Sequence, residues 1–149
     1  MIRKDVMDDA KAIQTLVNTY EKDGEMLPLS INDIYEKILE FVVWDDGGEL
    51  LGCCAIHPTW EDLAEIRSVA VNPNSKKNGI GRALVERSIE TAQILGISKV
   101  FLLTYVPGFF GKLGFTEVEK EELPKKIWSD CLKCAKFPDC DEIAMIKKL

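Results

Sequence analysis

The chain carries the stretch Val69-Ala-Val-Asn-Pro-Asn-Ser-Lys-Lys-Asn-Gly-Ile-Gly-Arg-Ala-Leu84, whose character changes twice along its length. Residues Leu63 to Val71 predict a strand, which should end before Pro73 because proline lacks the N–H group that a strand ladder needs. Residues 74–78 are polar and cationic and predict a loop, and from Gly79 onward the apolar residues fall at helical spacing. A strand, a basic loop with glycine and a helix in this order predict an anion-binding site. The N–H groups of the first helical turn are unpaired there, and the helix dipole adds positive potential.

The positions of the glycines narrow the choice of anion. The loop matches neither the G-x-x-x-x-G-K-[ST] motif of P-loops nor the G-x-G-x-x-G motif of dinucleotide-binding folds. The segment Lys76-Lys77-Asn78-Gly79-Ile80-Gly81 instead resembles the [Q/R]-x-x-G-x-[G/A] loop of the GNAT acetyltransferases, whose loop amides hold the pyrophosphate of acetyl-CoA. Lys76 departs from that pattern, since the family usually has arginine or glutamine there. The resemblance implies that acetyl-CoA is bound by Lys76, Lys77, Asn78, Gly79, Ile80, Gly81 and Arg82.

Length, composition and charge limit the class of protein. At 149 residues, with 46% hydrophobic residues, the chain is expected to fold as one domain spanning residues 1–149. The net charge of −6 argues against a nucleic-acid partner, which needs a basic surface. No apolar run suits a membrane span, and no secretory signal is predicted. An odd number of cysteines, five, then favours a reducing, cytoplasmic setting.

Apolar periodicity predicts two helices and an antiparallel meander in the first half of the chain. The first helix has an inward stripe made of Val6, Ala10, Ile13, Val17 and Tyr20. Ser30 and Asp33 resemble a capping box for a second helix, whose apolar stripe runs from Ile31 to Ile38. Three strands follow, predicted at residues 41–44, 49–57 and 63–71, with a hairpin turn at residues 45–48.

The second half is predicted to form a right-handed β-α-β unit followed by a short helix and two strands. A helix runs from Gly79 to Leu95 with Gly96 as its C-terminal cap, and the continuously apolar run from Val100 to Leu103 suits a strand buried on both faces. The inward residues of that helix are Leu84, Val85, Ser88, Ala92 and Leu95. The remaining elements are a helix at residues 109–113 and strands at residues 115–118 and 141–147.

The order of these elements resembles the GNAT topology over nearly the whole chain. The resemblance implies an α/β (α+β) fold with a mixed central sheet of about seven strands, flanked by about four helices. Five segments together look like the acetyltransferase domain of N-acetylglutamate synthases, most of all the short form that lacks an amino-acid-kinase domain. These segments are Leu63–Val71, Phe101–Tyr105, Phe109–Phe115, Leu123–Trp128 and Cys131-x-x-Cys134-x5-Cys140-Asp-Glu142. The implied activity is acetyl-CoA-dependent N-acetyl transfer to an amino acid, L-glutamate first, as in the opening step of arginine synthesis.

Acetyl transfer to an amine needs a base for the amine proton, donors for the oxyanion and a thiolate that can leave. In GNAT enzymes a glutamate at the position of Glu65 often takes this proton, directly or through water. The alternative is that Glu65 only forms an ion pair with Arg67. Strand alternation would place on one face Glu65, Arg67, Val69 and Val71, and on the other Ala64, Ile66, Ser68 and Ala70. A bulge typical of the family implies that backbone N–H groups near Val69 and Val71 meet the pantetheine and the thioester carbonyl.

The general acid of the family is often a tyrosine in a helix that reads F-Y-x-x-x-G-F, and Phe110 stands at that position. Phe110 has no proton to give, so the role implied for it is contact with the cofactor. Tyr105, at the end of the preceding strand, is the nearest substitute in sequence. Tyr105 as an ordinary strand-end aromatic residue, and departure of the thiolate without assistance, both remain open.

The carboxylates of an amino-acid acceptor need cations, for which Arg67 and Lys125 are the candidates. Two departures from related synthases weaken the case for glutamate, because Leu29 stands where arginine is common and Lys125 where histidine is common. Another amino acid or amine is therefore an open alternative. A non-catalytic sensor of acetyl-CoA or an amino acid is a further one, which Phe110 favours. The oligomeric state stays undecided, with a homodimer as one option.

His57 and the cysteines complete the candidate groups. His57, the only histidine, is expected to be packed or half-exposed rather than catalytic. Cys131, Cys134 and Cys140 have the spacing of a metal site but lack an obvious fourth ligand. Free structural thiols are preferred, a zinc site is the minority hypothesis and a disulfide is the third alternative. No metal is expected to be required for the chemistry.

Overall fold

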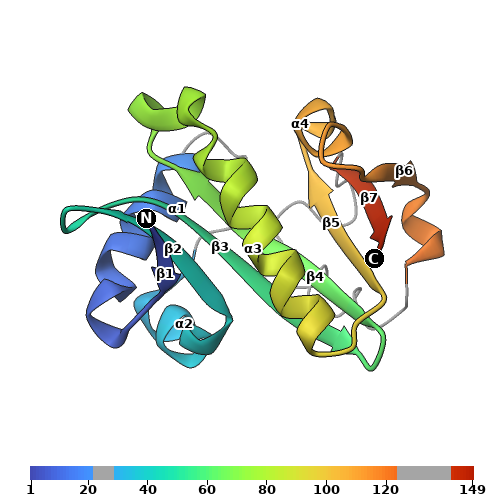
Figure 1. Cartoon of the computed structure of the whole chain (residues 1–149), viewed down its shortest axis with the longest axis horizontal. Coiled ribbons are helices and arrows are strands. Elements are labelled where there is room, and N and C mark those ends of the chain that lie inside the picture. Colours follow the sequence, from blue (N-terminus) through green and yellow to red (C-terminus); the bar gives the residue numbers. More distant parts are fainter. Residues whose placement is uncertain (22–28, 124–141) are drawn as a thin grey trace.

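The computed structural model describes residues 1–21, 29–123 and 142–149, without the side chains of Tyr20, Glu21 and Lys77 (Figure 1). In this part of the chain seven strands form one mixed sheet in the order β1-β2-β3-β4-β5-β7-β6. The strands are β1 (Ile2–Lys4), β2 (Phe41–Asp46), β3 (Glu49–Trp60), β4 (Leu63–Val71), β5 (Lys99–Thr104), β6 (Thr116–Val118) and β7 (Ile143–Lys148). The α-helices are α1 (Ala10–Glu21), α2 (Ile31–Glu36), α3 (Ile80–Ile94) and α4 (Pro107–Gly111). The short 3-10 helices are η1 (Met7–Asp9), η2 (Ile38–Glu40), η3 (Pro73–Asn78) and η4 (Lys120–Glu122).

This arrangement confirms the predicted mixed α/β fold. The capping box at the start of α2 is also confirmed, since Ser30 Oγ accepts from the N–H group of Asp33 at 3.0 Å. None of the helices within the three described ranges is long and apolar enough to cross a membrane.

The sheet divides at β4. Strands β1 to β4 pair antiparallel with their neighbours, as do β5, β7 and β6, whereas β4 and β5 pair in parallel through the α3 crossover. The parallel ladder is short and joins only Leu63–Glu65 to Lys99–Phe101. Beyond Glu65 the two strands diverge, as Figure 1 shows. The second half of β4 therefore does not pair with β5, and this division of the sheet is the feature that positions the candidate site.

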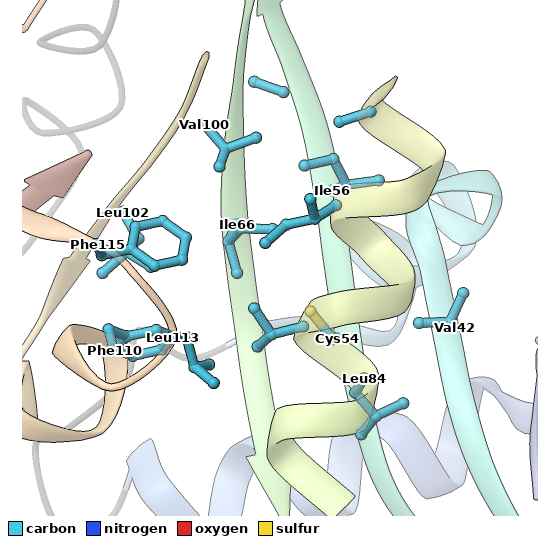
Figure 2. Packing of buried hydrophobic residues seen from close by; sticks show 14 of the residues in the cluster. Val42, Cys54, Ile56, Ile66, Leu84, Val100, Leu102, Phe110, Leu113 and Phe115 are labelled. Carbon is cyan, nitrogen blue, oxygen red and sulfur yellow. The ribbon is translucent and has the colours of Figure 1, made fainter. Parts of the chain in front are cut away.

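Helices cover both faces of the sheet. On one face α3 packs on β3 and β4, and Cys54, Ile56, Ile66 and Leu84 belong to the buried cluster between them (Figure 2). The same cluster continues beyond β4 into the C-terminal half through Leu102, Phe110, Leu113 and Phe115 (Figure 2). On the other face α1 and α2 enclose a second cluster that includes Ile13, Ile34, Val43, Cys53 and Ala70. A third, smaller cluster consists of Leu63, Phe101, Leu123 and Ala144.

Several element ends differ from the sequence-based predictions. Val6 does not belong to the apolar stripe of α1 and is 57% exposed, because it caps η1 and the α-helix begins only at Ala10. Leu95 is not inward but 59% exposed, because α3 ends before it and Gly96, with a φ of 85°, redirects the chain. The short helix α4 begins earlier than predicted, since Pro107 occupies the first helical turn, where proline is well tolerated.

Candidate active site

A β-bulge interrupts β4 at its centre. The register with β3 shifts between Cys53 and Ala55, so that Ser68 and Val69 lie opposite Cys54 alone. Ser68 has a φ of 53°, in the left-handed region that residues with a Cβ atom seldom adopt. No glycine marks this position in the sequence, so the pattern of residue types gave no local signal for the bulge.

The bulge changes which side chains share a face. Before it, Arg67 pairs with Ala55, a core residue beneath α1 and α2, and Glu65 lies on the same face. After it, Val69 and Val71 pack with the α3 cluster. The prediction that Glu65, Arg67, Val69 and Val71 share one face is therefore wrong, because one extra residue turns all later side chains over. The α3 face carries instead Ala64, Ile66, Val69 and Val71.

The predicted anion-binding loop follows the C-terminal end of β4. Residues Pro73–Asn78 form the 3-10 helix η3, in which Asn72 Oδ1 accepts from the N–H group of Asn74 at 3.0 Å. Gly79, with a φ of 72°, is the N-cap of α3 and occupies the left-handed region that glycine favours. The first intrahelical bond runs from the N–H group of Ala83 to the carbonyl of Gly79 at 3.1 Å. The earlier N–H groups of this turn have no intrahelical acceptor and suit an anion.

The remaining predicted cofactor residues of this loop are placed differently from one another. Lys76 and Asn78 are exposed on η3, whereas the Ile80 side chain is buried in the α3 core, so that only its backbone can face a ligand. Arg82 is exposed and its Nε donates to Oε1 of Glu86 at 2.9 Å, one helical turn later. The side chain of Lys77 lies outside the described part of the structure.

Gly81 brings the first turn of α3 into contact with α4. A Cβ atom on Gly81 would lie 3.3 Å from Cζ of Phe109 and 3.5 Å from Cγ2 of Val71. Phe109 therefore reaches from α4 to α3 across the divergence of β4 and β5. The sequence did not predict this contact, because no local pattern relates the two helices.

Glu65 lies where the parallel ladder ends, beside Phe101 of β5. Nε of Arg67 donates to Oε1 of Glu65 at 2.6 Å, and the two side chains are only 13% and 21% exposed, Glu65 being the less exposed. The ion pair considered as the alternative to catalysis is thus present. It places a pair of oppositely charged side chains at the point where the strands separate.

His57 is the cross-strand partner of Glu65 and forms its own ion pair. Its Nδ1 lies 2.8 Å from Oε2 of Glu40, the last residue of η2, and the His57 side chain is 32% exposed. The expected half-exposed histidine is confirmed. The pairing with Glu40 was not predicted, and its only signal in the sequence is an acidic residue directly before β2.

Tyr105 and Phe110 flank the divergence from the β5 side. Tyr105 is half-buried and follows the last residue of β5. Phe110 is buried and packs edge to face against Phe109 and Phe115, with ring centroids 4.9 Å and 5.8 Å apart. The helix that carries a tyrosine in many related enzymes therefore contributes an aromatic core here.

The predicted substrate residue Lys125 and the cysteines Cys131, Cys134 and Cys140 lie outside the described residues. Within residues 1–21, 29–123 and 142–149, no group of three or more His, Cys, Asp or Glu side chains could hold a metal ion. Cys53 and Cys54 are free and buried, and burial raises the pKa of the Cys54 thiol to about 12. These two thiols therefore stay protonated and act as apolar packing groups.

Comparison with known proteins agrees with this geometry. A family model described as the acetyltransferase (GNAT) family matches residues 7–115. An uncharacterized N-acetyltransferase of Chlorobaculum tepidum is 45% identical over 148 residues, which cover 99% of this chain and 96% of that protein. A protein named amino-acid acetyltransferase from Mycobacterium tuberculosis is 37% identical over 134 residues, which cover 87% of this chain and 76% of the relative.

Solved structures give the same result. The match to the structure of Rv2747 from Mycobacterium tuberculosis, a complex with CoA, has a TM-score of 0.86 and 32% identity. It covers 100% of this chain and 99% of the Rv2747 chain. N-acetylglutamate synthase from Neisseria gonorrhoeae, in complex with coenzyme A and N-acetyl-glutamate, has a TM-score of 0.92 and 27% identity. The match covers 100% of this chain but 35% of the gonococcal one. The chain therefore belongs to the acetyltransferase (GNAT) family and is an acyltransferase that uses acetyl-CoA.

Proposed function

We propose that the chain transfers the acetyl group of acetyl-CoA to the α-amine of an amino acid, L-glutamate first. The observation that carries the proposal is the position of Glu65, where β4 leaves β5 on the strand that leads to the anion-binding turn of α3. The relative named amino-acid acetyltransferase and the synthase complex with N-acetyl-glutamate support the class of acceptor. Residues 1–149 act in this proposal as one domain, in the cytoplasm and at the opening step of arginine synthesis.

The proposed chemistry divides between backbone and side chains. Backbone N–H groups of residues 76–82 bind the pyrophosphate, and those near Val69 and Val71 bind the pantetheine and polarise the thioester carbonyl. Glu65 accepts a proton from the acceptor ammonium group, directly or through water. The nitrogen lone pair attacks the carbonyl carbon, the N–C bond forms and the C–S bond breaks. The departing thiolate takes a proton from Tyr105 or from solvent.

The acceptor is bound in this proposal by Arg67 and Lys125, which supply cations for its carboxylates. Leu29 and Lys125 replace an arginine and a histidine that related synthases commonly have. An amino acid other than glutamate, or another small amine, is the alternative acceptor that these two departures favour.

A second candidate function is non-catalytic binding of acetyl-CoA or an amino acid. Phe110 favours it, because the position that often supplies the acid carries a buried aromatic ring with no hydroxyl group. A binding protein would bind acetyl-CoA without releasing CoA in the presence of any acceptor, which distinguishes the two functions directly.

Steady-state acetylation with a panel of amino acids and amines tests the proposal. We expect Glu65→Gln to lower kcat by ~10²–10⁴-fold with little change in acetyl-CoA affinity, because the variant cannot accept the amine proton. Glu61→Gln, an exposed glutamate in the turn before β4, is the matched control and should keep the parental rate. A Glu65→Gln variant with most of its rate would show that Glu65 has only a structural role.

A further inference from the structure

A second ionisable group faces Glu65 from the neighbouring strand. His57 of β3 is the direct cross-strand partner of Glu65, and directly opposed residues place their Cβ atoms about 5 Å apart on one face of the sheet. We propose that His57, oriented by Glu40, is the positioning residue that receives the amine proton from Glu65. This inference rests on the proposed function, because it needs Glu65 as the first proton acceptor.

Glu40 fixes the orientation of the imidazole ring. Its Oε2 lies 2.8 Å from Nδ1 of His57, and η2 holds it in place directly before β2. A carboxylate on Nδ1 keeps the proton of the neutral ring on that nitrogen and leaves Nε2 as the proton acceptor. Within the described ranges no protein group binds Nε2. The ring is therefore prepared to take up one proton.

The carboxylate of Glu40 contacts His57 through one of its two oxygens. The second oxygen, Oε1, is buried and has no hydrogen-bond partner among the residues that the structure describes. The contact with Nδ1 of His57 at 2.8 Å therefore holds the carboxylate and the ring in one arrangement.

Arg67 contacts the carboxylate that receives the proton first. Its Nε donates to Oε1 of Glu65 at 2.6 Å. Since an imidazole group ordinarily binds a proton more tightly than a carboxylate does, a proton that arrives at Glu65 moves on to His57.

Lys4 brings a further cation close to Glu40. Its Nζ donates to the backbone carbonyls of Leu39 and Phe41, on either side of Glu40, and lies 3.7 Å from Oδ1 of Asp5. Lys4 is thus held by backbone oxygens and by the aspartate. The imidazole is the group in direct contact with the Glu40 carboxylate.

The proton transfer balances without another reactant. One N–H bond of the acceptor ammonium breaks, and the proton bonds first to the carboxylate of Glu65 and then to Nε2 of neutral His57. Glu65 returns to its ionised form, and the amine lone pair is available to attack the thioester. The imidazolium later releases its proton to solvent through the exposed part of the ring.

The test compares kcat across pH, at saturating acetyl-CoA and acceptor, for the parent chain, His57→Gln, His57→Ala and Glu40→Gln. We expect the His57 variants to lose about 10- to 100-fold in kcat with an unchanged KM for acetyl-CoA. The acidic limb in the neutral range, where imidazole groups titrate, should disappear in His57→Gln. Glu40→Gln should lower kcat as well, because the imidazole ring loses the carboxylate that orients it. Glu36→Gln, an exposed glutamate of α2, is the matched control and should leave the profile unchanged.

Added imidazole provides a readout that a purely structural role would not affect. It should restore kcat of His57→Ala in a concentration-dependent manner and leave Glu65→Gln unchanged. A His57→Gln variant with parental kcat and acidic limb, beside an inactive Glu65→Gln, would overturn the inference while the proposed function stands. A parent chain that acetylates no acceptor of the panel would overturn both. If His57→Gln fails to fold, imidazole rescue of His57→Ala and the kcat of Glu40→Gln decide whether His57 receives the proton.

Discussion

The backbone conformation of Ser68 determines which side chains of β4 face the candidate site. Its left-handed φ of 53° belongs to the bulge that leaves Glu65 and Arg67 facing α1 and α2 while Val71 turns towards α3. The thiol of Cys53 donates to the carbonyl of Ser68, with a sulfur–oxygen distance of 3.4 Å, and stabilises the bulge from the neighbouring strand. The strand that carries the base candidate can therefore place Val69 and Val71 against α3 before the chain enters the cofactor turn.

Substitutions of Ser68 should reveal this conformation in the free energy of unfolding. Ser68→Val should lower it by ~1–2 kcal/mol relative to Ser68→Ala, because a β-branched side chain tolerates the left-handed region poorly. Ser68→Gly should be at least as stable as Ser68→Ala, since glycine adopts this conformation without steric cost. Urea unfolding at fixed pH measures these differences. Equal stability of Ser68→Val and Ser68→Ala would mean that the bulge does not hold this φ in solution.

At the level of elements, α3 and α4 approach each other closely at Gly81. A Cβ atom there would lie 3.3 Å from Cζ of Phe109, closer than most Cβ contacts, and 3.5 Å from Cγ2 of Val71, and the same turn presents the unpaired N–H groups. Gly81→Val should therefore displace α4 or the first turn of α3. We expect acetyl-CoA binding to weaken by about 10- to 100-fold, corresponding to an overpacking cost of ~1–3 kcal/mol.

Calorimetric titration with acetyl-CoA measures this effect. Gly108→Ala is the control, because a Cβ atom on Gly108 would have no neighbour within 4 Å. A Gly81→Val variant that binds acetyl-CoA like the control would place the cofactor away from the first turn of α3.

The elements themselves could be predicted because their signals are local. The apolar stripe of α1, the capping box of Ser30 and Asp33 and the helix start at Gly79 each depend on residues within one or two turns of one another. The bulge at Ser68 could not be located, because it depends on how β4 registers with β3 and no glycine marks it. Strict alternation consequently assigned Val69 and Val71 to the wrong face.

The candidate site could be predicted only in part for the same reason. Glu65 and the glycine loop were identified from motifs that are contiguous in the chain. The pairing of His57 with Glu40 joins residues 17 positions apart, and the contact of Phe109 with Gly81 joins two separate helices. Such pairs arise from tertiary packing, which one sequence does not record as a pattern.

At the scale of the whole molecule, charged groups fasten the N-terminal strand to the rest of the sheet. Arg3 of β1 donates two hydrogen bonds to Asp9, at 2.8 Å and 3.0 Å, and one to Asp45 at 3.0 Å. The Arg3 guanidinium lowers the pKa of both carboxyl groups below their usual range. Stability from these pairs is present above the pKa of the unfolded carboxyls and is lost as the pH falls below it.

Asp5, two residues later, should give the stability of the molecule the opposite pH dependence. Its side chain is fully buried, neither oxygen has a hydrogen-bond partner among the described residues, and burial raises its pKa from 3.8 to about 6. The folded state therefore binds this proton more tightly than the unfolded state does. The contribution to the free energy of unfolding is complete below about pH 4 and is lost as the pH rises through 6, with a difference of at most about 3 kcal/mol.

Asp5→Asn removes the charge and nearly keeps the shape, so it should remove the decline in the free energy of unfolding between pH 4 and pH 7. Asp8→Asn, at an exposed position of η1, is the matched control and should retain the decline. Urea unfolding at half-unit pH steps gives the two curves. Because the contribution of the Arg3 ion pairs changes with pH only below about pH 4, the difference in slope between Asp5→Asn and its control above that value reports the buried carboxyl. A slope in Asp5→Asn equal to that of the control would mean that water reaches Asp5 in the folded protein and that burial does not raise its pKa.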